Sequence, residues 1–316
     1  EIEFIYNTNT CNMNKFIKAI KSPSYVFYYL VIKITNKYPA FLPDSIVIKA
    51  LFYFEIGYKL NLKHPKTFNE KLQWLKLYQR DPKMTKMVDK YEAKQYVSDR
   101  VGEEYIIPTL GVWDSFDNID FEKLPNQFVL KTTHDSGGVV IVRNKSMLDR
   151  KEAREILMKS MKHDFYQKFK EWPYKNVTHR IIAEKYMEDE SGYELKDYKI
   201  FCFNGVPKLI QVDFGRFSKH KRNIYSTDWE YLGFSSLYPT DPNIKIRRPK
   251  KLDSMLNIAK KLSKGMPHVR IDLYLIYDQI YFGELTFYHE SGFGKFKPEK
   301  WDTILGEWIK LPYFAR

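Results

Sequence analysis

Two neighbouring stretches near the C-terminus have the composition of β-strands, and each carries one acid on an apolar background. Residues 268–274 read His-Val-Arg-Ile-Asp-Leu-Tyr, and residues 280–286 read Ile-Tyr-Phe-Gly-Glu-Leu-Thr. The polar residues 277–279 predict a turn between the two strands. If this loop holds three residues, Asp272 and Glu284 lie directly opposite each other and point to the same face of the hairpin.

The N-terminal part of the chain predicts helices. Residues 14–62 are rich in aliphatic residues and tyrosine. Because proline cannot continue a helix, we expect this region to be interrupted at Pro23, Pro39 and Pro43.

Residues 67–78 have the apolar spacing of an amphipathic helix, with Thr67 and Glu70 as a capping box at its start. Further helices are expected at 89–101, 151–163, 251–263 and 298–309. Further strands are expected at 106–108, 127–131, 139–142, 180–186, 197–203 and 207–213. Helices and strands mix without strict alternation, which predicts an α+β fold rather than a doubly wound sheet.

The charge of the chain points to an anionic partner. The 316 residues include 52 Lys and Arg against 39 Asp and Glu, a net charge of +13. Such a surplus suits an acidic glycan, an acidic lipid surface, a nucleotide or a nucleic acid. No zinc-finger spacing, aromatic RNA-binding signature or basic zipper is present, so we expect no nucleic acid partner.

The cysteines and the apolar runs indicate a cytoplasmic protein. Cys11 and Cys202 stand far apart and form no disulfide framework, which favours a reducing compartment. No apolar run reaches the length of a membrane span. Residues 25–32 come nearest, and they predict either a buried helix or a helix on the inner membrane face. The lysines beside this run are Lys18, Lys21, Lys33 and Lys37. No cleavage site follows the run, and Met13 is a candidate natural start.

The opposed acids of the hairpin suggest a metal site. Two close carboxylates repel each other, so a positive charge must compensate them. Oxygen ligands without a nearby Cys or His favour Mg²⁺ or Mn²⁺, held together with the phosphates of a nucleotide. Arg270 lies on the same face and could contact a reacting anion. A structural salt bridge within the sheet is the alternative reading of the same residues.

A second group of candidates lies around a glycine-containing loop. Lys131 ends a strand just before it and can reach phosphate oxygens. In residues 134–138, His-Asp-Ser-Gly-Gly, backbone N–H groups could surround a phosphate, although a plain hairpin turn explains the glycines equally well. The loop is neither a Walker loop nor a dinucleotide fingerprint.

Other polar residues are weaker candidates. Glu184 lies on a strand that runs into an acidic linker, where the backbone and the carboxylate could bind a purine. Asp197 and Lys199 begin the next strand and could bind ribose or phosphate. A basic loop follows residues 207–213, and it is either solvated or captures an acidic substrate. Its members are Arg216, Lys219, His220, Lys221 and Arg222.

Several other chemistries have no support in the sequence. Cys202 has no nucleophile signature, and neither a Gly-x-Ser-x-Gly elbow nor a His-Glu-x-x-His motif occurs. The His-Arg-Asp and Asp-Phe-Gly motifs of protein kinases are also missing. The absence of Asp-x-Asp weighs against a glycosyltransferase without excluding one.

The order of these motifs resembles that of ATP-grasp ligases, including the D-alanine–D-alanine ligases. The closer resemblance is to the TupA-like ATP-grasp family, which is named for teichuronopeptide synthesis and occurs in bacterial gene sets for capsules and surface polysaccharides. The similarity extends from about residue 40 to the end. It is carried by residues 66–71, 88–94, 197–205, 270–272 and 282–287.

The resemblance implies an ATP-grasp fold, in which two α+β lobes clasp a nucleotide, preceded by an N-terminal helical region. The implied segments are an N-terminal helical region at 1–65, a helical segment at 66–125, an N-lobe at 126–190 and a C-lobe with the metal site at 191–316.

The resemblance also implies a role for each motif residue. ATP phosphates are held by Lys90 and by Lys131, which also acts in catalysis, and are covered by the loop containing His134, Ser136, Gly137 and Gly138. The rest of the nucleotide is bound by Glu184, Lys185, Met187, Asp197 and Lys199. Magnesium is bound by Asp272, Glu284 and Thr286, and Arg270 steadies the tetrahedral intermediate. Thr286 stands where related ligases have Asn, which leaves a second metal open. Substrate is bound by Ser291 and Gly292, besides the basic-loop residues Arg216, Lys221 and Arg222.

The implied activity is ATP-dependent ligation of a carboxylate to an amine through an acylphosphate. The expected acid is a hexuronic acid of a surface polysaccharide, and the expected amine is an amino acid or another small amine. Two alternatives stay open: a glycosyltransferase that uses a nucleotide sugar, and a nucleotide-binding module without catalysis.

Overall fold

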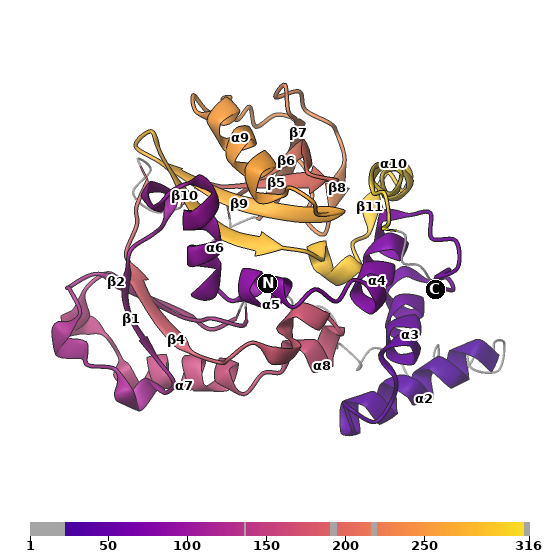
Figure 1. Cartoon of the computed structure of the whole chain (residues 1–316), viewed down its shortest axis with the longest axis horizontal. Helices are drawn as coiled ribbons and strands as arrows, with labels where there is room; N and C mark the ends of the chain where they lie inside the picture. Colours follow the sequence, from indigo (N-terminus) through magenta and orange to yellow (C-terminus); the bar gives the residue numbers. More distant parts are fainter. Residues whose placement is uncertain (1–22, 136, 190–194, 216–219, 313–316) are drawn as a thin grey trace.

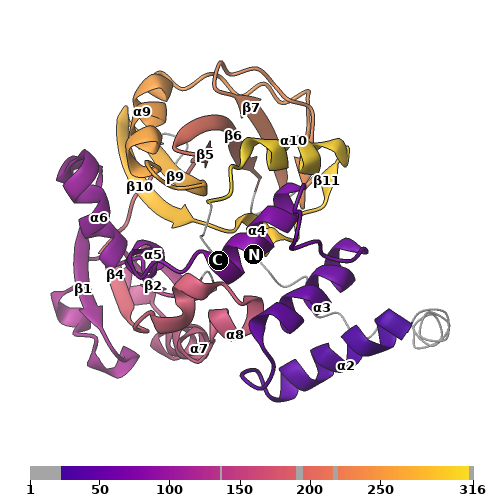
Figure 2. The same cartoon turned by 45° about the vertical axis from the view of Figure 1, so that its right-hand side comes forward.

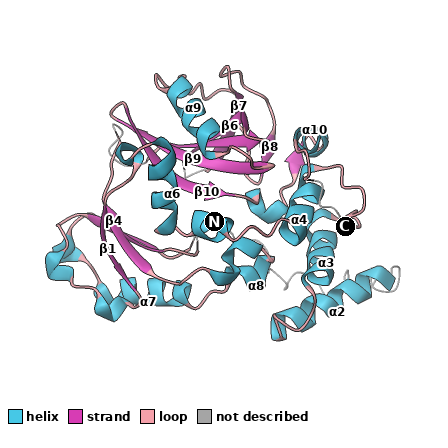
Figure 3. Cartoon of the chain, viewed as in Figure 1, coloured by secondary structure: helices cyan, strands magenta, loops and turns pink. Residues whose placement is uncertain are grey.

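The computed structural model describes residues 23–135, 137–189, 195–215 and 220–312. Two lobes, each built around an antiparallel sheet, face each other, and a pair of helices projects from one corner (Figure 1). Helices and strands are mixed along the chain (Figure 3), and the predicted α+β class is confirmed. The predictions for Cys11, Met13, Lys18 and Lys21 concern residues outside the described part.

The N-terminal helices begin and end where proline and glycine require it. Helix α2 (Pro23–Lys37) starts at Pro23, and α3 (Asp44–Ile56) starts directly after Pro43. Helix α3 ends at Gly57, whose φ of 97° is left-handed and costs glycine little. The two helices pack through aromatic rings, with the centroids of Tyr28 and Tyr53 5.1 Å apart. The predicted interruptions by proline are thus present.

Helix α4 (Phe68–Tyr78) begins with the predicted capping box, in which Thr67 and Glu70 each accept a hydrogen bond from the other's backbone N–H. Its polar side chains donate to carbonyl groups far along the chain: Gln73 to Gly292, and Lys76 to Ser291 at 2.7 Å. Helix α4 also lies against α10 (Lys300–Trp308) in Figure 2. It therefore fastens the segment that follows the last hairpin.

The smaller sheet has the strand order β1-β4-β2-β3. Its strands are β1 (Thr109–Trp113), β2 (Phe128–Thr132), β3 (Val139–Val142) and β4 (Ile181–Lys185). Helix α7 (Arg150–Met161) packs against one face, where Phe128 and Leu130 are buried. Val129 and Lys131 alternate with them and face the larger lobe.

The larger sheet has the order β10-β9-β5-β6-β7. Its strands are β5 (Asp197–Phe203), β6 (Val206–Phe214), β7 (Lys221–Ser226), β9 (His268–Ile276) and β10 (Gln279–Thr286). Helix α9 (Leu252–Leu262) covers its outer face (Figure 1). The inner face carries polar residues of neighbouring strands in register, such as Lys199 opposite Asp272 on one side and Gln211 on the other.

The remaining elements complete the lobes: α5 (Lys83–Val88), α6 (Glu92–Val101), α8 (Phe165–Phe169), and the short strands β8 (Ser235–Ser236) and β11 (Phe296–Lys297). The helix expected at 89–101 begins at Glu92, and Asp89 precedes it as a capping residue whose carboxylate accepts from the N–H groups of Tyr91 and Glu92. The first strand starts at Thr109, after Pro108, and not at residue 106.

Within the described residues, no helix combines the length and the apolar character that crossing a bilayer requires.

Candidate functional site

The last hairpin brings Asp272 and Glu284 together by a different route from the predicted one. The turn contains two residues, Tyr277 and Asp278, both with positive φ, so the expected three-residue loop is wrong. A bulge between Phe282 and Glu284 shifts the register by one residue and restores the pairing of Asp272 with Glu284.

Gly283 occupies the bulge for a steric reason. A Cβ at this position would lie 3.0 Å from the Tyr274 ring and 3.1 Å from the carbonyl oxygen of Asp272. The opposed carboxylates therefore depend on a glycine one residue before Glu284.

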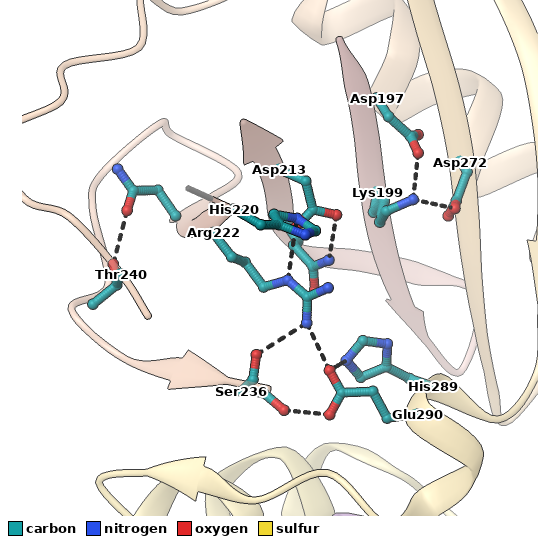
Figure 4. A network of polar contacts seen from close by, with 12 residues as sticks. Asp197, Lys199, Asp213, His220, Arg222, Ser236, Thr240, Asp272, His289 and Glu290 are labelled. Carbon is teal, nitrogen blue, oxygen red and sulfur yellow. Dashed lines mark hydrogen bonds and ion pairs between the residues drawn. The ribbon is translucent and has the colours of Figure 1, made fainter. Parts of the chain in front are cut away.

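Both carboxylates are compensated by cations of the chain itself. The Arg270 guanidinium donates to the two Asp272 oxygens at 2.7 Å each and to Glu284 Oε1 at 3.2 Å. Lys199 lies between Asp272, at 2.9 Å, and Asp197 (Figure 4). Without a ligand, the residues make the salt-bridge network that was the alternative interpretation of this motif.

The surroundings act differently on the two acids. Burial works to raise the pKa of Glu284, but Arg270, Lys90 and Lys199 bring it to about 2. Burial raises the pKa of Asp272, and the like charges of Asp197 and Glu284 add to this effect. The cationic neighbours oppose that rise, and the bidentate contact with Arg270 favours the ionised form.

A cleft of ≈ 400 Å³ lies between the two sheets and is lined by half of the predicted site residues. The predicted residues that line it are Lys90, Lys131, Glu184, Lys185, Met187, Asp197, Lys199, Arg270, Asp272 and Glu284. Both sheets contribute, so residues separated by up to 194 positions in sequence, from Lys90 to Glu284, border one space.

Three lysines add positive charge around Glu184 and the glycine-containing loop. Glu184 Oε1 lies 2.7 Å from Lys94 Nζ, and Glu184 Oε2 lies 2.6 Å from Lys131 Nζ. Burial would raise the pKa of Glu184, but the two lysines lower it below its ordinary value. Lys90 donates to the carbonyl of Asp135 in the glycine-containing loop, and burial lowers the pKa of Lys90.

The glycine-containing loop is packed onto its own lobe. His134 is buried, and its ring stacks on His179 with the centroids 3.5 Å apart; burial lowers its pKa to about 4. Gly138 is buried, and a Cβ there would lie 2.4 Å from Ser160 Oγ. Gly137 is exposed. None of these residues is among those that line the cleft.

The other predicted substrate and metal residues lie beyond the cleft lining. Lys221 and Arg222 belong to strand β7, so they are not part of the loop that was expected there. Arg222 is buried and pairs with Asp213 and Glu290. Thr286 Oγ1 donates to Glu284 at 2.6 Å.

Ser291 and Gly292 lie in the turn after β10, where the Ser291 hydroxyl donates to Glu171 at 2.6 Å. Ser136, Arg216 and Lys219 lie outside the described residues.

Sequence reasoning missed the apolar walls of the cleft. These are Ile107, Val129, Val139, Ile141, Tyr186, Leu195 and Tyr274. Strand alternation could have predicted Val129 as a cleft residue, because it lies two residues before Lys131 and points to the same face of β2. Lys94 was also missed as a partner of Glu184, because that contact joins a helix to a distant strand.

The residues of the hairpin can hold magnesium only if a nucleotide supplies further oxygen ligands. Among the described residues, no group of three or more His, Cys, Asp or Glu side chains could hold a metal. Asp272 and Glu284 supply two carboxylates that line the cleft, and the Thr286 hydroxyl, which contacts Glu284, is one further oxygen. Mg²⁺ is commonly held by one or two carboxylates plus nucleotide phosphates, so the residues present fit it.

Comparison with known proteins gives one family. The family described as TupA-like ATPgrasp matches residues 70–310. None of the curated proteins compared with the chain matches it.

Solved structures of ATP-grasp ligases are similar at low identity. The D-alanine–D-alanine ligase of Bacillus anthracis, complexed with ATP, is 16% identical over 64% of this chain and 53% of that one, with a TM-score of 0.37. The same enzyme of Helicobacter pylori is 15% identical over 77% and 69%, with a TM-score of 0.37. The ADP complex of N5-carboxyaminoimidazole ribonucleotide synthetase is 15% identical over 69% and 50%, with a TM-score of 0.42. The chain spans about half the length of the first and the third.

Proposed function

Because the chain belongs to the TupA-like ATP-grasp family, we propose that it is an ATP-dependent ligase that joins a carboxylate to an amine. The observation that carries the proposal is the position of Asp272, Glu284 and Arg270 across a cleft from Lys90 and Lys131. Acids that can share a cation, an arginine beside them and lysines opposite are the parts that phosphoryl transfer needs.

In this proposal the cleft binds ATP along its length. The apolar side chains between the sheets enclose the base, and the backbone around Met187 pairs with its edge. Lys90 and Lys131 neutralise phosphate charge, and Lys131 exchanges its contact with Glu184 for one with the nucleotide. To cover the phosphates, as the resemblance implies, the glycine-containing loop would have to leave its packing against its own lobe; Lys90 contacts it through the carbonyl of Asp135.

Asp272, Glu284 and Thr286 are the residues that would hold magnesium. When bound, the ion would neutralise the negative charge of the phosphate oxygens. Arg270 and Lys199 already compensate these acids, so nucleotide and ion binding must loosen some of the existing contacts.

The reaction itself is two displacements. A carboxylate oxygen of the acid attacks the γ-phosphorus, ADP leaves, and an acylphosphate forms. The amine then attacks the acyl carbon, the amide bond forms, and phosphate leaves with the electron pair of the broken C–O bond and takes up the proton that the nitrogen loses. Arg270 stabilises the charge on the tetrahedral oxygen, and the enclosed cleft keeps water away.

We propose a hexuronic acid of a bacterial surface polysaccharide as the acid, and an amino acid or another small amine as its partner. The net charge of +13 suits such an acidic substrate. The reaction would take place on the cytoplasmic side, where ATP is available.

A coupled assay tests this function. Purified protein, ATP and magnesium should release phosphate only when both a uronic acid and an amine are present, and mass spectrometry should detect the amide. Release of a nucleoside diphosphate from a nucleotide sugar without ATP would instead identify a glycosyltransferase. Binding of ATP without any turnover would identify a nucleotide-binding module.

We also propose that helix α2 rests on an acidic membrane surface. Its outer side exposes Phe27 and Leu30 by 54% and 53%, and Phe41 in the following turn by 73%. The helix carries Lys33 and Lys37 and no acid. Exposed aromatic and aliphatic side chains with lysines among them suit an anionic lipid surface, and α2 projects at the edge of the molecule (Figure 1).

Vesicle flotation should detect this contact. We expect the protein to float with vesicles that contain phosphatidylglycerol and to remain unbound with pure phosphatidylcholine. Leu30→Glu combined with Phe27→Glu should reduce the bound fraction at least about tenfold, since both apolar anchors are lost. Tyr277→Glu, a change of the same kind on the exposed β9–β10 turn, is the control. Unchanged flotation of the double variant would contradict the proposal. So would a wild-type protein that is a dimer in solution while the double variant is a monomer, because the apolar side chains would then contact a second copy of the chain.

A further inference from the structure

Arg270 has a contact beyond the two acids of the hairpin. Its Nη1 lies 3.1 Å from Nδ1 of His289, which follows β10 and is buried. Arginine can only donate, so Nδ1 of His289 must accept and carries no proton. The ring of His289 packs edge-on against Phe201, with the centroids 4.7 Å apart, which fixes its plane.

The other nitrogen of His289 faces an acid. Nε2 lies 3.3 Å from Glu290 Oε1. Burial works to raise the pKa of Glu290, but hydrogen bonds from His289 and Ser236 and the charge of Arg222 lower it, to about 2, so this carboxylate is ionised and accepts. His289 is therefore neutral with its proton on Nε2, an assignment that follows from both of its partners.

Glu290 is itself held firmly. Arg222 Nη1 donates to Glu290 Oε1 at 2.6 Å, and Ser236 Oγ donates to Oε2 at 2.5 Å. Arg222 in turn donates through Nε to Asp213 at 2.7 Å. Figure 4 shows this continuous series of contacts from β6 and β7 to His289. Strand β7 thus sets the position of the residue that orients Arg270.

The contacts of Arg270 within the described residues leave one of its N–H groups unused. Nε and Nη2 serve Asp272, Nη2 also serves Glu284, and Nη1 serves His289, so four of the five N–H groups are used within the described residues. The remaining N–H is on Nη1, the nitrogen that His289 orients. Because the guanidinium is planar, Asp272 and His289 together fix the direction of this N–H.

We propose that His289 is a positioning residue that aims the free Nη1–H of Arg270 at the oxygen of the reacting acyl group. This inference rests on the function proposed above. No contact between His289 and substrate is required, because the effect passes through Arg270. Glu290 and Arg222 fix the tautomer and the place of the imidazole ring, as outer partners do for a metal-bound histidine.

Two substitutions of His289 separate its two contacts. In His289→Asn, the amide oxygen lies near the place of Nδ1 and can still accept from Arg270. In His289→Gln, the longer side chain reaches the place of Nε2 and can still donate to Glu290, but nothing accepts from Arg270. We expect kcat to fall about 10²-fold in His289→Gln and less than about tenfold in His289→Asn. The KM for ATP and the melting temperature should be similar in the two variants.

Equal losses of kcat in the two variants, or a greater loss in His289→Asn, would overturn the proposal. A second measurement does not depend on the reaction. The ¹⁵N shifts of the His289 ring, assigned by their disappearance in His289→Gln, should show the proton on Nε2. A proton on Nδ1 would overturn the inference. If the tautomer is as expected and the wild-type protein joins no acid to an amine, the proposed function has failed and not this arrangement of His289.

Discussion

Replacing Asp272 by Asn is expected to lower the turnover of ATP about 10³-fold, equivalent to about 4 kcal/mol of transition-state stabilisation. The amide keeps the volume of the side chain but removes one of the two negative charges of the opposed carboxylates on the hairpin, both of which line the cleft. Glu284→Gln should have an effect of the same order, because the two carboxylates are paired across β9 and β10. The measurement is steady-state release of phosphate with ATP, magnesium, acid and amine.

The folded protein must be shown to survive this change, because Asp272 also compensates Arg270 and Lys199. Each cation keeps a second acid, Glu284 or Asp197, so we expect the variant to fold with a lowered melting temperature. Asp278→Asn is the matched control, because it makes the same chemical change at an exposed position of the same hairpin. It should leave turnover within about twofold of wild type, as surface substitutions do.

Magnesium dependence separates loss of the metal site from general damage. In the wild-type protein, magnesium should strengthen binding of a non-hydrolysable ATP analogue, as calorimetry can measure. In Asp272→Asn this gain should be lost, while binding of the analogue without magnesium stays close to that of Asp278→Asn. Full activity of Asp272→Asn, or an unchanged magnesium effect, would exclude the assigned ligands.

The opposed acids could be predicted from the sequence because strand periodicity decides which residues share a face. Asp272 and Glu284 lie on strands that are close in the chain, and the alternation of each strand is visible in the residues. The loop length was wrong, yet the pair was right, since the bulge at Gly283 adds the residue that the shorter turn removes. In the same way, Val129 and Lys131 are two residues apart on β2, which places both on the side that faces the cleft.

The partners of these residues could not be predicted, because they come from elements distant in sequence. Lys94 and Glu184 are 90 positions apart, and their contact depends on how a helix packs on a sheet. Arg222 looked like part of a solvated basic loop, because charged residues are mostly exposed. Its burial depends on Asp213 and Glu290, and nothing in the local sequence indicates that pairing.

Replacing Arg222 by Met should lower the free energy of unfolding at pH 7 by about 4 kcal/mol. Methionine fills much of the same volume, but it leaves the carboxylates of Asp213 and Glu290 buried without their main cation. Arg248→Met is the matched control, because Arg248 makes a similar 2.7 Å contact with Asp253 at the surface. That exposed pair should be worth less than about 1 kcal/mol. Urea denaturation of both variants measures the difference.

The pH dependence of this loss of stability shows whether Arg222 acts through its charge. Burial would raise the pKa of Asp213 and of Glu290, but their partners, Arg222 among them, hold the first well below its ordinary range and the second at about 2. Such carboxylates stabilise the fold above their unfolded pKa of about 4, and this contribution is lost as the pH falls through the folded pKa. Without Arg222 both pKa values should rise, so the acids bind protons at higher pH and no longer need the cation. The difference between wild type and Arg222→Met should therefore be greatest near pH 7 and should shrink steadily toward pH 3. A difference that stays constant over this range would mean that Arg222 stabilises the protein by packing and not by its charge.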